Sequence, residues 1–231
     1  MTRPDCAAPG VTVLSLGAGV QSSALLLLCD REPARVGAAL GIEGFRLDFA
    51  VFADTGDEPT AVYEWLGRLE SAVSIPVVRA APLGVLSANL LGSARGQAGS
   101  ARPPWFLKNA DGSQGMIRRQ CTRTYKVEVV SNAIRERLGY RPRQRMRHHV
   151  TRLIGISRDE VYRVKASVEP WATNRHPLVD MAWSRSDCTR YAKSTGLGTP
   201  PRSACWHCPY RSDDEWIAMR DNDPASFAKA V

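Results

Sequence analysis

The sequence predicts an α/β protein with a doubly wound, mostly parallel sheet of about five strands and a cysteine-bearing C-terminal segment. Short apolar segments at residues 11–14, 46–53 and 75–78 alternate with longer segments of helical periodicity, as in parallel βαβ units. The chain has 231 residues, of which 44% are hydrophobic and 23% charged, which is ordinary for a globular domain.

We expect three parts along the chain. Residues 1–10 form a flexible leader, residues 11–175 form the α/β domain, and residues 176–231 form a cysteine-containing segment packed on it. Residues 84–115 are rich in Gly, Ser and Pro and lack an apolar period, so we expect a mobile loop or lid there.

The first strand leads through a loop of small residues into an apolar helix that includes residues 24–28. This loop, SLGAGVQSS at residues 15–23, packs two glycines and three serines into nine residues. Glycines let the backbone approach a ligand, and free N–H groups at a helix N-terminus attract anions. The expected phosphate contacts come from Ser15, Gly17, Gly19, Gln21, Ser22 and Ser23. The alternative is a tight strand-to-helix turn without a ligand, because neither the P-loop lysine nor a third glycine is present.

The second strand, residues 46–53, ends at Asp54 and Thr55. Open α/β sheets place ligand groups at the carboxyl ends of their strands, so Asp54 is a candidate site residue. A helix over residues 60–73 follows, with an apolar face that indicates core, and then the third strand. Beyond the loop, the sequence predicts a helix over 127–138, a strand over 152–156 and a short helix after Ser157.

The middle of the chain is strongly basic. Residues 102–152 carry 13 Lys and Arg against 3 Asp and Glu, a net charge of +10, whereas the whole chain carries +8. Such a local excess indicates a polyanionic or multiply phosphorylated ligand. A basic helix that only faces solvent is the alternative.

The six cysteines are too sparse for a disulfide scaffold and favour metal or redox roles. Cys205 and Cys208 have the spacing of a metal clip, and with Cys121 and Cys188 they supply the four thiolates that zinc or a 4Fe–4S cluster needs. Basic residues around Cys121 favour its thiolate. A zinc clip that uses His207 or His176, and a redox dithiol without metal, remain open. Cys29 lies on an apolar helix and is expected to fill the core.

Taken together, these motifs resemble the PP-loop ATP pyrophosphatase superfamily, and within it the branch of phosphoadenylyl-sulfate reductases and of the ATPases that thiolate tRNA and DNA. The resemblance covers roughly residues 11–216. It rests on SLGAGVQSS at 15–23, ADTG at 53–56, CTRTYK at 121–126, GIS at 155–157 followed by Asp159 and Glu160, Asp187-Cys188, and CWHCP at 205–209. The resemblance implies an adenine nucleotide alpha-hydrolase-like fold.

For function, the resemblance implies ATP with Mg²⁺ on the first loop, cleavage of the α–β phosphoanhydride, and an adenylated acceptor attacked by sulfur. It implies nucleotide contacts from the loop residues 15–23 with Asp54, Thr55 and Gly155. The catalytic residues it implies are Asp54, Arg123, Lys126 and Arg158. It favours a 4Fe–4S cluster over Zn²⁺ on the four cysteines, a DNA or RNA acceptor for phosphorothioation or base thiolation, and a sulfur donor such as a cysteine desulfurase.

One position departs from the family pattern. Many members have an aspartate where this chain has Gln21, and an amide does not ligate Mg²⁺ as a carboxylate does. The metal would then be positioned by Asp54, Asp57 or Glu58, or by the nucleotide itself.

Two other functions remain open. An adenylyl-sulfate or phosphoadenylyl-sulfate reductase would share the fold, but the tail DNDPASFAKAV lacks the cysteine that such enzymes use. A non-catalytic nucleotide-binding subunit of a nucleic-acid modification complex is the other. No stretch approaches the roughly 18 apolar residues of a membrane span, and the first ten residues lack the long apolar segment of a secretory signal, so we expect a cytoplasmic protein without a membrane partner.

Overall fold

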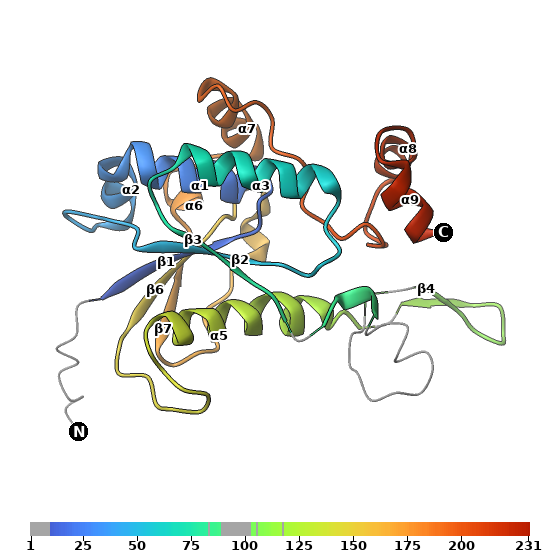
Figure 1. Cartoon of the computed structure of the whole chain (residues 1–231), viewed down its shortest axis with the longest axis horizontal. Helices are drawn as coiled ribbons and strands as arrows, with labels where there is room; N and C mark the ends of the chain where they lie inside the picture. Colours follow the sequence, from blue (N-terminus) through green and yellow to red (C-terminus); the bar gives the residue numbers. More distant parts are fainter. Residues whose placement is uncertain (1–9, 83, 89–102, 105, 117) are drawn as a thin grey trace.

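The computed structural model describes residues 10–82, 84–88, 103–104, 106–116 and 118–231. Its centre is an all-parallel sheet of five strands in the order β3-β2-β1-β6-β7 (Figure 1). The strands are β1 (Val11–Leu16), β2 (Phe49–Ala53), β3 (Val77–Ala80), β6 (Val150–Ile154) and β7 (Ala172–Arg175). The predicted fold class, a doubly wound parallel α/β sheet, is confirmed.

Helices cover both faces of this sheet (Figure 1). One face carries α1 (Val20–Arg31), α2 (Pro33–Leu40), α3 (Thr60–Ala72), α6 (Pro177–Asp180) and α7 (Arg185–Ser194). The other face is covered by α5 (Glu128–Arg137), which continues a π-helical segment, η1 (Arg123–Val127). Successive residues of β1 point to opposite faces of the sheet. Leu14 belongs to the core on the α1 side, and Val13 belongs to the core on the α5 side.

The order of the strands reverses beside β1. The chain first builds β2 and β3 on one side of β1, and then returns to place β6 and β7 on the other. Ser15 of β1 consequently lies between Val51 of β2 and Ile154 of β6. In an open parallel sheet, the carboxyl ends of the strands at such a switch point form the usual ligand crevice.

Several boundaries differ from the sequence predictions. Helix α1 begins at Val20, four residues before the apolar run from which it was predicted. The pattern did not indicate this first turn, because its buried side chains are polar. Strand β7 was missed because its sequence, ATNR, has no apolar alternation. The expected lid contains a hairpin of β4 (Phe106–Lys108) and β5 (Gln114–Met116), while residues 89–102 and the leader, 1–9, lie outside the described residues.

The C-terminal segment returns across the carboxyl end of the sheet. After α7 the chain passes through the Cys205–Cys208 clip to α8 (Asp213–Asn222) and α9 (Pro224–Ala230), which lie beyond that end (Figure 1). Between β6 and β7 lies a 3-10 segment, η2 (Arg158–Arg163). Within the described ranges, no helix has the length and apolar character needed to cross a membrane.

Candidate functional site

The loop between β1 and α1 has the features of an anion site. Ala18 is buried and has a left-handed backbone (φ 53°), a strained conformation for a residue with a side chain. Ser22 fixes the turn, because its Oγ accepts from Gly17 N at 3.1 Å and donates to Gly19 O at 3.4 Å. The N-cap residue of α1 is Gly19, and no side chain among the described residues caps this helix N-terminus. Its first N–H groups therefore remain available to a negatively charged ligand.

The end of β6 presses against the same helix turn. A Cβ added to Gly155 would lie 2.7 Å from Ser22 N and 2.8 Å from Ser22 Cα. These are backbone atoms that cannot move aside cheaply, so only glycine fits. Gly155 thus packs against the first turn of α1 beside the loop, and its contact with a nucleotide stays a prediction.

Gln21 is already occupied by protein partners. Its buried amide donates from Nε2 to Ser157 Oγ at 3.3 Å and to Glu160 Oε2 at 3.1 Å, and its Oε1 accepts from Arg185 Nη1 at 2.9 Å. The side chain therefore joins α1, η2 and the start of α7. Sequence reasoning missed Arg185, whose only signal was its place directly after the helix cap Ser184.

The three carboxylates proposed for Mg²⁺ have different surroundings. Asp54 is partly exposed and accepts from Gly56 N at 2.8 Å and from Tyr63 Oη at 2.7 Å. Asp57 is buried and accepts from the backbone N and the Oγ of Ser87 at 2.6 and 2.7 Å. Glu58 is also buried. Of the three, Asp54 has the access to solvent that a nucleotide-bound metal requires.

Glu58 and Asp57 instead anchor the cysteine clip. Glu58 pairs with Lys126 Nζ at 3.0 Å and accepts from Ser203 Oγ at 3.3 Å. Asp57 receives His207 Nε2 at 3.2 Å, and its carbonyl accepts the backbone N–H of Trp206 at 2.9 Å. Through these contacts, the loop after β2 links the Cys205–Cys208 clip to the carboxyl end of the sheet, where the loop between β1 and α1 also lies.

Charge is retained in this buried network. Burial alone would raise the pKa of Asp57, but hydrogen bonds from His207 and Ser87 hold it below its ordinary value. Burial alone would lower the pKa of Lys126, but the carboxylate of Glu58 and the nearby Cys205 hold it above its ordinary value. The Asp57 carboxylate and the Lys126 ammonium therefore stay ionised at neutral pH.

Three of the four predicted metal-ligating cysteines line one small cavity. Cys121, which precedes η1, lies with Cys205 and Cys208 around a space of about 80 Å³ that His207 and Lys126 also line. Cys205 Sγ is 3.5 Å from Thr55 Oγ1. Burial, helped by the negative charge of Glu58, raises the pKa of Cys205 to about 12, so the free thiol is neutral.

Cys188 is not part of this cavity. It is completely buried on α7, within the core that α7 shares with α1, and burial raises its pKa to about 12. The prediction that four cysteines converge on one centre is therefore wrong for Cys188, which fills the core as a small hydrophobic residue. Cys29 does the same on α1, as predicted.

The chemistry of the remaining donors still fits a metal. In the described part of the chain no three His, Cys, Asp or Glu side chains are preassembled at metal-binding distance. The cavity nevertheless gathers three thiols with His207, whose Nδ1 is buried and has no hydrogen-bond partner in the part of the chain that the structure describes. Thiolates and imidazole suit zinc or iron–sulfur centres, and such sites are commonly completed by the metal itself.

The predicted basic residues do not form one surface. Arg123 and Arg158 have exposed side chains, and Arg123 pairs with Glu128 at 3.0 Å. The exposed arginines of residues 141–147 lie in the loop before β6, at the opposite end of α5 from Arg123. The basic segment is therefore split into one part beside the cysteine cavity and another near the amino end of β6.

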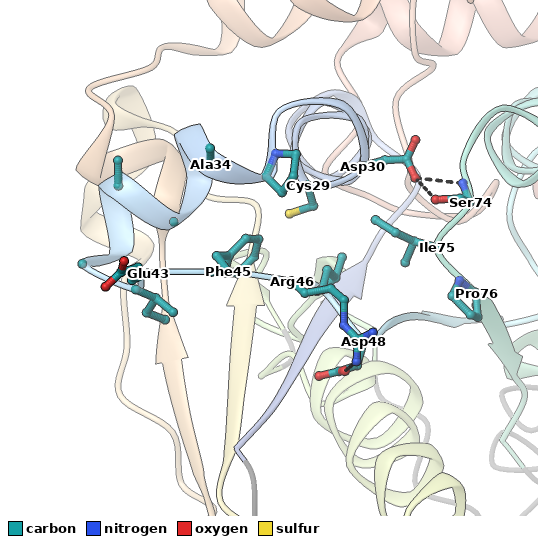
Figure 2. Close-up of a pocket in the computed structure, with 17 residues that line it drawn as sticks. Cys29, Asp30, Ala34, Glu43, Phe45, Arg46, Asp48, Ser74, Ile75 and Pro76 are labelled. Carbon is teal, nitrogen blue, oxygen red and sulfur yellow. Dashed lines mark hydrogen bonds and ion pairs between the residues drawn. The ribbon is translucent and has the colours of Figure 1, made fainter.

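A larger hollow of about 1190 Å³ lies away from these residues, between the end of α1, α2 and the start of β2 (Figure 2). Two of its carboxylates are engaged, since Asp30 accepts from the backbone N and Oγ of Ser74, and Asp48 accepts from Thr12 N, while the third, Glu43, is exposed. It lies at the amino end of β2, away from the switch point. The carboxyl end of the sheet remains the better candidate site.

Comparison with known proteins agrees with the predicted fold. No family model matches the chain, and no curated protein matches it. Among solved structures, the chain is similar to the phosphoadenylyl-sulfate (PAPS) reductase from Candida auris in its phosphate complex, with 16% identity, a TM-score of 0.51, and coverage of 87% of this chain and 83% of that one. This likeness shows a shared fold.

A looser similarity is to the U34-tRNA thiolase NcsA from Methanococcus maripaludis, solved with its [4Fe-4S] cluster. The identity is 13% and the TM-score 0.43, over 100% of this chain and 72% of that one. At that score, the second similarity supports no conclusion about this chain.

Proposed function

We propose that this chain is an ATP pyrophosphatase that adenylates an acceptor for sulfur transfer. The observation that carries the proposal is one juxtaposition: an uncapped helix N-terminus behind a strained glycine loop, at the switch point of the sheet, linked through residues 54–58 to a cavity of three cysteines. A site that only bound nucleotide would need no thiols beside it. In this proposal residues 11–175 bind the nucleotide and residues 176–231 complete the cysteine cavity.

The reaction follows from this arrangement. An acceptor oxygen attacks the α-phosphorus of ATP, the bond from that phosphorus to the bridging oxygen breaks, and pyrophosphate leaves with the negative charge. Backbone N–H groups of residues 18–22 would stabilise that charge, because the loop holds them in place before the reaction begins. Hydrosulfide then attacks the atom that bears the adenylated oxygen, a base carbon or a backbone phosphorus. The bond from that atom to the oxygen breaks, AMP leaves with the oxygen, and the hydrosulfide proton is released, so the acceptor exchanges oxygen for sulfur.

Individual residues take separate roles in the proposal. Asp54, the partly exposed carboxylate, holds Mg²⁺ together with phosphate oxygens. Ser15 completes the nucleotide site, whereas the predicted contacts of Ser23 and Thr55 are replaced by supporting roles, because both are buried and Ser23 Oγ accepts from Trp65 Nε1 at 2.8 Å. Lys126 favours the thiolate form of Cys205, and the exposed Arg123 and Arg158 contact pyrophosphate or acceptor when these bind.

The cofactor of the proposal is a metal centre on Cys121, Cys205 and Cys208. A 4Fe–4S cluster there would bind or relay sulfide, and Zn²⁺ is the alternative. The acceptor is a nucleic acid, because the excess of +10 over residues 102–152 suits a polyanion. A cysteine desulfurase is the proposed sulfur donor, and a reducing cytoplasm would keep the thiols free.

The proposal is tested by product analysis. Purified anaerobic protein is incubated with Mg²⁺, ATP, sulfide and either total tRNA or DNA, and nucleotide and phosphate products are separated. We expect AMP and pyrophosphate in equal amounts, with sulfur entering the nucleic acid. Sulfite release from an adenylyl sulfate, without ATP cleavage, would instead identify a reductase. ATP binding without either product would identify a non-catalytic subunit.

A further inference from the structure

The imidazole of His207 is an unusual group in the cysteine cavity. Its side chain is only 10% exposed, and Nε2 lies 3.2 Å from Asp57 Oδ2. Its other nitrogen, Nδ1, is buried without a hydrogen-bond partner among the described residues. A buried polar atom without a partner is destabilising, because it has lost its hydrogen bonds to water. The arrangement is therefore incomplete without a further group at Nδ1.

Asp57 determines which ring nitrogen carries the proton. The carboxylate is 2% exposed and is fixed by Ser87, whose backbone N and Oγ donate to it at 2.6 and 2.7 Å. An ionised carboxylate accepts hydrogen bonds only, so the neighbouring Nε2 is assigned the N–H and Nδ1 the lone pair. Histidines that ligate metals characteristically donate their second ring nitrogen to a carboxylate in this way.

We propose that His207 Nδ1 is a ligand of the metal centre, joining Cys121, Cys205 and Cys208, with Asp57 as the residue that positions its ring. His207 lines the same cavity as the three thiols and lies within the Cys205–Cys208 clip. The inference rests on the metal centre of the proposed function. It replaces Cys188, which the fold places in the core, with the imidazole as fourth donor.

The ligand set has a functional consequence. Three thiolates and one imidazole saturate a tetrahedral metal, and saturated sites hold structure in place, whereas catalytic sites keep an open position. Cys121, Cys205, Cys208 and His207 would together hold the metal, and the uncharged imidazole would be the donor that an incoming sulfide could replace.

The test uses Zn²⁺ alone as probe on the full chain under anaerobic conditions, because Zn²⁺ has no redox chemistry. X-ray absorption of the loaded wild-type protein should show three sulfur neighbours at about 2.3 Å and one nitrogen at about 2.0–2.1 Å, with the outer scattering of an imidazole ring. A first shell of sulfur and oxygen without imidazole scattering would overturn the inference, and this measurement needs no variant.

Variants supply the second measurement, which is Zn²⁺ affinity against a competing chelator. His207→Ala should remove the imidazole scattering and weaken Zn²⁺ binding at least ~10-fold, and Asp57→Asn should weaken it by about 10–100-fold, as loss of an orienting carboxylate does. His176→Ala is the matched control. It removes another histidine with a buried, unpartnered ring nitrogen, but one outside the cavity, and should change neither result.

The outcomes separate this inference from the proposed metal centre. If Cys205→Ser abolishes Zn²⁺ binding while His207→Ala leaves spectrum and affinity unchanged, the centre stands and the histidine ligand is wrong. If neither substitution affects Zn²⁺ binding, both the centre and its histidine ligand are wrong.

Discussion

The ion pair of Lys126 with Glu58 shows how single residues hold the cysteine cavity together. The Glu58 side chain has no exposed surface, so its charge depends on Lys126 Nζ at 3.0 Å and on Ser203 Oγ. Lys126 belongs to η1, five residues after Cys121, while Ser203 lies two residues before Cys205. One buried carboxylate thereby holds together the two segments that carry the thiols.

Replacement of Lys126 by Met should therefore be costly. It leaves Glu58 as an uncompensated buried charge, and we expect the free energy of unfolding to fall by about 3 kcal/mol, at the low end for a broken buried pair because Lys126 is partly exposed. Arg123→Met is the control, since the Arg123–Glu128 pair is exposed and should cost less than about 1 kcal/mol. Equal losses in urea denaturation would show that Glu58 is not held by Lys126.

At this scale the sequence predicted which residues gather but not which way they point. Asp54, Asp57 and Glu58 follow one strand within five positions, yet only Asp54 keeps access to solvent. Their partners, Ser87, Lys126 and His207, come from distant parts of the chain. The prediction for Cys188 was wrong for a related reason. A cysteine that fills the core and a cysteine that binds a metal cannot be told apart in the sequence.

The element on which the proposed function depends is the junction of β1, α1 and β6. The backbone of this loop is tightly constrained, because Ala18 has a left-handed conformation and Gly155 packs directly against the backbone of Ser22. Strain of this kind persists only where the surrounding structure imposes it, and it is concentrated at functional sites.

We expect Gly155→Ala to displace the first turn of α1, because its Cβ would contact Ser22 N at 2.7 Å. ATP turnover should fall about 100-fold, as a misplacement of about 1 Å can cause. Gly67→Ala is the control, because a Cβ on this α3 glycine meets nothing within 4 Å. Circular dichroism would verify that both variants are folded. Unchanged turnover in Gly155→Ala would separate the loop from catalysis.

Elements with a strong apolar pattern were predictable and the others were not. Strands β1, β2 and β3 and helix α3 were found within a few residues, because burial imposes their periodicity. Strand β7 was not, since pairing with β6 rather than apolar alternation makes ATNR a strand. The start of α1 was placed too late, because buried Gln21, Ser22 and Ser23 resemble a loop in composition.

At the scale of the whole molecule, two buried thiols make stability sensitive to alkaline pH. Burial raises the pKa of Cys29 and of Cys188 from 9.0 to about 12. Above pH 9 the unfolded chain loses these protons while the folded protein keeps them, so stability present below pH 9 is lost as pH rises towards 12.

The free energy of unfolding should therefore fall by about 1.4 kcal/mol per pH unit for each thiol in this window. Cys29→Ala removes one titrating thiol and leaves the others, so urea denaturation between pH 9 and 11 should show a slope shallower by about that amount. Parallel pH profiles for the variant and the wild-type protein would show that Cys29 does not titrate with a raised pKa.

The distribution of basic residues also concerns the whole molecule. Arginines before β6 lie at the opposite end of α5 from those beside the cysteine cavity, so a long polyanion could contact both parts. We expect affinity for DNA or RNA to fall steeply between about 50 and 200 mM salt, through counterion release. We expect a smaller slope of log affinity against log salt concentration when Ala replaces Arg141, Arg143, Arg145 or Arg147. The slope should fall by about one unit for every phosphate contact that is lost. Affinity that does not change with salt would leave these arginines as solvated surface.

The central claim, that nucleotide phosphates lie over the N-terminus of α1, is tested most directly by a crystal structure with α,β-methylene-ATP and Mg²⁺. This analogue cannot be cleaved between the α- and β-phosphorus. We predict phosphate oxygens within hydrogen-bond distance of backbone N–H groups of residues 18–22, with Mg²⁺ near Asp54. Phosphates bound in the hollow between α1, α2 and β2 (Figure 2), or nowhere near this loop, would contradict the claim.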